Sequence, residues 1–353
     1  MKKELLTASA LAASLVVPGV ASAASMSMSG YSLNGITSND ADSSSDASYS
    51  ATQDSGMSIS VSETTDGGVT ISSGFTLVNE GATSATESGL TLTFTDGSSL
   101  ELLDAGTAYA GALASVPSAS GEQGLGATSH NTSSTSLTWG SKTAAVGLDW
   151  NSAADFMGVE GLTFGVSAGL GDDATASTAT INTDSGFSVG ATYVTTAGDS
   201  TVTIGGGMVT SEGNSTNQSN SNSDSVALSA SVVTGDLTVG AGFSTGEGLA
   251  QEGSVSINEI DDVEVINVGA SYVSGDMTFT VSYKDGSVKS AELATAAGTS
   301  TDSQEVVGAS VDYAVASGVT ATIGYENRDD TLNGAAVPSD SGGSIYLGAK
   351  ISF

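Results

Sequence analysis

Residues 277–283 read Met277-Thr-Phe-Thr-Val-Ser-Tyr283, in which large apolar and small polar side chains alternate strictly. Successive side chains of a β-strand point to opposite faces, so the segment predicts a strand with one apolar face and one face of Ser and Thr. The same alternation recurs in residues 162–168, 187–193, 237–243 and 319–325. In each segment the second face consists of Ser, Thr or Gly.

The small, uncharged second face decides the fold class. A strand of a soluble sandwich would usually carry Lys, Glu and Arg on its outward face, and soluble domains contain about 25% charged residues. Only 13% of this chain is charged. A wide membrane barrel accounts for the pattern, because its apolar face meets lipid and its polar face lines water. Aromatic residues at strand ends, such as Tyr193, Tyr272, Tyr283 and Tyr325, suit an interfacial girdle. The alternative interpretation is that they are core aromatics of a sandwich.

Short and long connections alternate between the predicted strands. The short connections lie at residues 65–68, 95–98, 196–199, 234–236, 274–276 and 316–318. Several of them contain Gly-Asp or Asp-Gly, which is typical of tight hairpin turns. Outer-membrane barrels combine short periplasmic turns with long outer loops. We count about sixteen strands, with one ambiguity, because residues 136–140 and 144–150 could form one strand or two. The sequence therefore predicts an all-β protein, a transmembrane antiparallel β-barrel wide enough to hold an aqueous channel.

The N-terminus has the features of an export signal. Lys2 and Lys3 precede a mostly apolar stretch over residues 5–20, and Ala21-Ser-Ala23 is a small-residue cleavage site. We expect residues 1–23 to be removed after Sec export and residues 24–353 to form the barrel. The formal net charge is −32, from 39 acidic and 7 basic residues. Nucleic acid is therefore not an expected partner, whereas cations are attracted.

Two segments carry a family resemblance. The start of the predicted mature chain, Met26-Ser-Met-Ser-Gly-Tyr31-Ser-Leu-Asn-Gly35, resembles the first strand of the alphaproteobacterial Gram-negative porins. The C-terminus, Ser344-Ile-Tyr-Leu-Gly-Ala-Lys-Ile-Ser-Phe353, resembles the signal that the barrel-assembly machinery recognises, with Tyr346, Leu347, Ile351 and Phe353 as its key positions. The hairpin at residues 88–104, followed by residues 105–118, resembles the fifth strand and the start of the third loop of that family.

The resemblance implies a sixteen-stranded porin in the bacterial outer membrane, surrounded by lipid and usually a homotrimer. It implies a water-filled channel for passive diffusion of small hydrophilic solutes and ions. The third loop, about residues 104–136, would fold inward and constrict the pore, and its Ala- and Gly-rich stretch at residues 105–115 could form a short helix. The alternative is an ordinary external loop.

The resemblance does not extend to the charges of the constriction. Members of the family typically oppose a cluster of Arg on the wall to acids on the third loop. Beyond the signal segment this chain has only five bases: Lys142, Lys284, Lys289, Arg328 and Lys350. Strand parity places Lys284, Arg328 and Lys350 on the small-residue face. It also places Glu101 and Asp312 there, and the acids of the third loop, Asp104 and Glu122, complete the candidate constriction residues. The alternative role of the three bases is to balance nearby acids at the strand ends. From the net negative charge and the missing Arg cluster we expect a cation-preferring channel.

No catalytic machinery is expected. The single histidine, His130, has no second histidine for a metal site and no evident triad. Clustered acids could bind Ca²⁺ weakly, the candidates being Asp40, Asp42, Asp46, Asp261 and Asp262. Solvated anionic loops are the alternative, and no other cofactor is expected. A secreted or surface-attached adhesive or surface-layer β-protein would share the acidic, Cys-free composition, but not the alternating C-terminus or the paired short and long loops.

Overall fold

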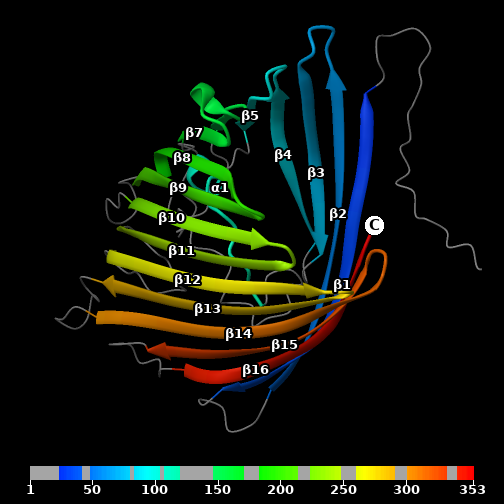
Figure 1. The fold of residues 1–353 in the computed structure, drawn as a ribbon, viewed down its shortest axis with the longest axis vertical. Helices are drawn as coiled ribbons and strands as arrows, with labels where there is room; N and C mark the ends of the chain where they lie inside the picture. Colours follow the sequence, from blue (N-terminus) through cyan, green and yellow to red (C-terminus); the bar gives the residue numbers. More distant parts are fainter. Residues whose placement is uncertain are drawn as a thin grey trace, which may run out of the picture.

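The computed structural model describes residues 24–41, 48–79, 83–103, 107–119, 146–170, 183–213, 223–247, 260–290, 300–331 and 340–353. Over these residues sixteen antiparallel strands form one closed barrel, in which each strand pairs with its neighbours in sequence and β1 pairs with β16 (Figure 1). The strands are β1 Ser25–Ala41, β2 Ser48–Thr64, β3 Thr70–Asn79, β4 Thr83–Thr93, β5 Ser99–Leu103, β6 Val146–Asn151, β7 Leu162–Leu170, β8 Thr183–Ala197, β9 Ser200–Gly213, β10 Ser223–Thr234, β11 Leu237–Glu247, β12 Ile260–Ser274, β13 Met277–Ser290, β14 Ser300–Ala316, β15 Val319–Thr331 and β16 Asp340–Ser352.

The predicted sixteen-stranded all-β barrel is confirmed. In the ambiguous region the structure has one strand, β6, which begins at Val146; residues 136–140 lie outside the described residues, as does the predicted signal segment. Two short helices are present in the described part of the chain, α1 (Ala108–Gly111) and the 3-10 turn η1 (Phe156–Gly158). Neither has the length and apolar character that a membrane-spanning helix requires.

The two faces of the wall differ as the alternation predicts. Large apolar side chains point outward and remain exposed, for example Leu228 at 58% and Leu347 at 57%. Small hydroxyl side chains point inward, and Ser188 and Ser244 are completely buried there. The strand-end aromatics Tyr193, Tyr272 and Tyr325 lie on the outer face. An outer surface of this kind avoids water and matches the lipid-facing surface of a membrane barrel.

The predicted short turns are present at one end of the barrel. The Gly-Asp turns place Gly198, Gly235 and Gly275 at positive φ of 64°, 56° and 61°. Hairpin turns of two residues need positive φ, which glycine adopts without a steric penalty. This is the physical reason why the Gly-Asp signal located these turns correctly.

The barrel closes where the last residue meets the first strand. The backbone N–H of Gly30 donates to the carbonyl of Phe353 at 3.0 Å, and the N–H of Phe353 donates to the carbonyl of Gly30, also at 3.0 Å. The Phe353 ring lies over Gly30, where an added Cβ would be 2.6 Å from Cζ of the ring. The seam therefore requires a residue without a side chain at position 30.

Candidate functional site

Residues 107–119, which we call the strap, run along the inner surface of the barrel. They begin with α1, whose first turn is capped by Thr107 because its hydroxyl accepts from the N–H of Ala110 at 3.4 Å. The strap then continues without regular structure across the inner faces of strands β7 to β14, as the cyan segment of Figure 1 shows. The predicted inward folding of the third loop and its short helix are confirmed for these residues.

Serine hydroxyls on the wall bind the strap backbone. Four strap N–H groups donate to wall serines: Ala108 to Ser167 at 3.1 Å, Tyr109 to Ser188 at 3.2 Å, Ala114 to Ser229 at 2.6 Å, and Ala119 to Ser282 at 3.1 Å. These serines belong to β7, β8, β10 and β13, so the contact extends over a wide sector of the wall. Irregular backbone needs such partners, because an unpaired buried N–H costs about 1–3 kcal/mol.

Glycines on the wall allow the strap to approach closely. A Cβ added at Gly190 would lie 2.2 Å from the carbonyl oxygen of Ala108, and one added at Gly205 would lie 2.0 Å from that of Ala112. At both positions the close neighbour of the wall glycine is the strap backbone. The wall is therefore shaped to hold the strap flat against it.

Two tyrosines fix the ends of the strap. Tyr109 is 1% exposed, and its hydroxyl bonds to the hydroxyl of Ser225 at 2.8 Å. Tyr346 on β16 is also 1% exposed and donates its hydroxyl to the carbonyl of Ala119 at 2.7 Å. Tyr346 points inward and packs against Leu33 of β1. Its side chain therefore connects the wall to the strap and does not line the open channel.

The inner face carries more acids than bases among the described residues. Among the inward residues whose side chains the structure describes, five are carboxylates: Asp54, Glu101, Asp149, Asp312 and Glu326. Three are bases: Lys284, Arg328 and Lys350. The predicted constriction acids Asp104 and Glu122 lie outside the described residues, together with Lys142 and His130.

Three inward acids were not among the predicted site residues. Asp149 lies between Leu148 and Trp150, so parity alone could have identified it. Asp149 is directly opposite Glu101 across the β5–β6 pair and accepts from the amide of Asn151 at 3.2 Å. Glu326 shares the parity of Arg328 and could have been found in the same way.

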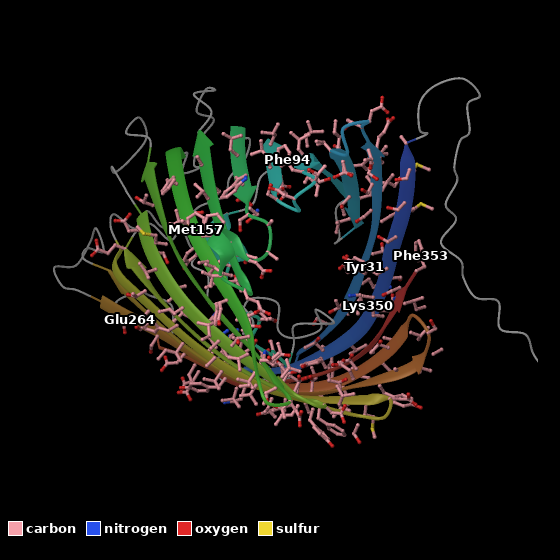
Figure 2. All side chains as sticks on the ribbon, turned by 45° about the horizontal axis from the view of Figure 1, so that its top comes forward. Tyr31, Phe94, Met157, Glu264, Lys350 and Phe353 are labelled. Atoms are coloured by element: carbon pink, nitrogen blue, oxygen red, sulfur yellow. The ribbon has the colours of Figure 1, made fainter. Side chains whose placement is uncertain are left out.

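Asp54 has no such signal, because its neighbours Gln53 and Ser55 are polar too. The hydroxyl of Tyr31 donates to Asp54 at 2.7 Å. The ammonium of Lys350 lies 5.0 Å from the centre of the Tyr31 ring. Figure 2 shows Tyr31 and Lys350 together on the inner side of the wall, whereas Glu264 lies on the outer side.

The three inward bases do not form one patch. Lys284 and Arg328 are both in register with Val306, one on each side of β14. Lys350 is in register with Thr320, which is eight residues from Arg328 along β15. At about 3.3 Å per residue this places Lys350 about 26 Å from Arg328 along the strand. No broad basic cluster is therefore present on the described inner face.

The calcium candidates are only partly placed. Asp40 lies in β1, and Asp261 and Asp262 lie in β12, whereas Asp42 and Asp46 are outside the described residues. Within the described ranges no three His, Asp or Glu side chains come together as a metal site. Calcium binding at these loops stays a prediction.

A closed barrel with a lipid-type outer surface, a polar interior and an internal strap defines a membrane channel. A family model described as Gram-negative porin matches residues 7–333, and the chain belongs to that family. No curated relative matches the chain.

Solved porins share the fold at low identity. OmpF of Salmonella typhi, in complex with daunomycin, superposes with a TM-score of 0.65 at 15% identity, covering 93% of this chain and 98% of its own. An anion-selective porin from Comamonas acidovorans gives 0.62 at 12% identity, with 94% and 100% covered. OmpT of Vibrio cholerae, in a trimer form, gives 0.58 at 16%, with 94% and 100% covered. The chain is an outer-membrane channel of the porin family.

Proposed function

We propose that this channel lets small hydrophilic solutes and ions diffuse passively and that it prefers cations. The observation that carries the proposal is the charge of the described inner face, where five carboxylates stand against three bases that are divided between two levels. Rings of acidic side chains favour cation passage and basic rings favour anions. The acids attract cations along the length of the wall.

The periplasmic mouth has the same sign. The described short turns contain no Lys or Arg, and they expose Asp66, Asp96, Asp199, Asp236 and Asp276. A mouth lined by one sign of charge raises the local concentration of counter-ions. The anion-selective Comamonas porin shares the fold at only 12% identity. The ion selectivity of this chain therefore has to be inferred from its own residues.

Reversal potentials in planar bilayers test the proposed selectivity. With a KCl gradient across the membrane, the zero-current potential should have the sign of a K⁺ diffusion potential. Its size should fall at high salt, because screening shortens the reach of the wall charges from about 10 Å at 0.1 M to about 3 Å at 1 M. A potential of the chloride sign overturns the proposal.

The proposal includes a homotrimer, a purely diffusive role without catalysis, and recognition of the C-terminal strand by the barrel-assembly machinery. The trimer form of the Vibrio OmpT structure supports the first. The exposed Leu347, Ile351 and Phe353 on the outer face of the last strand support the third. Native mass spectrometry of the detergent-solubilised protein tests the trimer, and a mass of one chain at all detergent concentrations contradicts it.

The family match favours a channel over the surface-layer alternative.

A further inference from the structure

Glu326 on β15 is an unusual inward carboxylate. It is 3% exposed, and its Oε1 has no hydrogen-bond partner within the described part of the chain. In register it lies between Gly308 on β14 and Ser344 on β16. A buried carboxylate oxygen without a donor is costly, and a cation in the adjoining lumen would offset that cost.

The end of the strap lies beside this carboxylate. An added Cβ on Gly308, the register partner of Glu326, would be 3.0 Å from Cβ of Ala119. The carbonyl of Ala119 accepts from the hydroxyl of Tyr346. Glu326 therefore lies beside Ala119, the last strap residue that the structure describes.

A second inward acid lies further along the wall toward the periplasmic end. Asp312 on β14 accepts a hydrogen bond from the hydroxyl of Thr322. It is four residues from Gly308, which places it about 13 Å along the strand from the level of Glu326. Tyr346 is in register with Gly324, between the level of Glu326 and that of Asp312. The two acids thus flank one tyrosine at successive levels of the channel.

The surroundings suit a small hard cation. The described residues around Glu326, such as Ser344 and Tyr346, supply hydroxyl oxygens, and oxygen is the ligand atom that alkali and alkaline-earth ions prefer. Arg328, two residues from Glu326, is the nearby positive charge and interacts with it electrostatically. One carboxylate next to one guanidinium favours weak binding of a monovalent ion, and a conducting channel needs sites weak enough to release the ion.

We infer that Glu326 is the carboxylate at which a permeating alkali cation binds as it passes Ala119 of the strap, and that Asp312 is the next binding step along the wall. This inference rests on the proposed cation preference and names the residues that produce it. It differs from an arrangement in which acids on the third loop itself determine selectivity, because both carboxylates belong to barrel strands.

The test uses the full mature porin in planar bilayers with K⁺ as the probe. Conductance and reversal potential are measured against KCl concentration for wild type, E326Q, D312N and the control E305Q. Glu305 is exposed on the outer face of β14, so E305Q makes the same chemical change away from the lumen. E326Q should lower the K⁺ to Cl⁻ permeability ratio about twofold or more and weaken conductance saturation, because a wall charge that concentrates cations is gone.

The outcomes separate this inference from the proposed function. A wild-type channel that prefers chloride refutes the cation preference itself. A cation-preferring wild type whose ratio is unchanged in E326Q overturns the inference and leaves the cation preference standing. D312N must also lower the K⁺ to Cl⁻ permeability ratio. If E326Q does not fold, an unchanged ratio in D312N overturns the inference. Equal losses in E326Q and E305Q also overturn the inference, because they indicate a general effect of net charge.

Discussion

Gly269 on β12 lies directly beneath Pro117 of the strap: a Cβ added at Gly269 would be 1.8 Å from the carbonyl oxygen of Pro117. No side chain fits in that space, so G269A must push the strap away from the wall or distort it. Overpacking of this kind costs about 1–3 kcal/mol. We expect a changed single-channel conductance with the barrel still folded.

The matched control for G269A is G286A. Gly286 lies on the inner face of the adjacent strand β13, and the nearest atom to its added Cβ is 3.8 Å away, which is an ordinary contact. Single-channel recordings should show wild-type conductance for G286A and a displaced value for G269A. Identical conductance in both variants means that the strap does not narrow the channel at this level.

A second prediction concerns the serines that hold the strap. Ser188 accepts from the N–H of Tyr109 and bonds to Ser167 at 2.5 Å. S188A leaves a buried N–H without its acceptor and should destabilise the protein by about 1–3 kcal/mol. Ser244 is equally buried, but its hydroxyl has no partner in the described ranges, so S244A should be nearly neutral.

The measurement for these serines is the temperature at which the folded band converts to the unfolded band on an unboiled gel. S188A should convert at a lower temperature than wild type and should show noisier open-channel current. If S244A lowers the transition temperature as much as S188A does, loss of a hydroxyl from the wall, and not release of the strap, is the cause.

The period of the alternation explains why so much of the fold was predictable. A wall between lipid and water needs opposite faces of opposite polarity, so its strands repeat every two residues and parity alone assigns a face to each side chain. Lys284 and Glu101 could be placed on the inner face in this way. The position of Pro117 over Gly269 could not, because the path of the strap depends on the register of strands far apart in sequence. Asp54 was missed because its neighbours are as polar as itself.

A third prediction concerns pH and the turn between β4 and β5. Asp96 accepts from the hydroxyl of Ser98 at 2.7 Å and from its N–H at 2.9 Å. These two hydrogen bonds lower the pKa of Asp96 below its usual 3.8. A lowered pKa means that the ionised form stabilises the folded turn; the contribution is complete above the unfolded pKa and is lost as pH falls through the folded one.

Wild type should therefore be more stable than S98A near neutral pH, and the difference should disappear as the pH falls through the lowered pKa of Asp96 and the carboxylate is protonated. The effect is small because Asp96 is exposed. Thermal transition temperatures at several pH values measure it. A difference that is constant down to the lowest pH assigns the role of Ser98 to packing instead of to the carboxylate.

A fourth prediction concerns the seam that closes the barrel. G30V places a branched side chain where an added Cβ already lies 2.7 Å from the carbonyl of Gly56 and 2.6 Å from the Phe353 ring. The exchange of hydrogen bonds between residues 30 and 353 should be lost or strained. We expect a reduced yield of folded protein on refolding into detergent, whereas G169A, whose Cβ meets nothing within 4 Å, should refold like wild type. Equal yields would mean that closure tolerates a displaced C-terminus.

The last prediction concerns like charges on the outer rim. Glu305 on β14 is directly opposite Asp285 on one side and Asp329 on the other, and all three are exposed on the outer face near the long-loop end. Like charges in direct cross-strand register destabilise a sheet by about 0.2–1 kcal/mol per pair. E305Q removes two such pairs with one substitution and should raise the thermal transition temperature.

The salt dependence separates this repulsion from other effects of the substitution. Screening reaches only about 3 Å at 1 M salt, compared with about 10 Å at 0.1 M, and the advantage of E305Q over wild type should shrink accordingly. D276N provides the control, because it removes an acid from an exposed turn that has no opposing acid in register. Should E305Q retain its full advantage in high salt, the gain comes from packing or hydrogen bonding of the new amide and not from relief of the charge row.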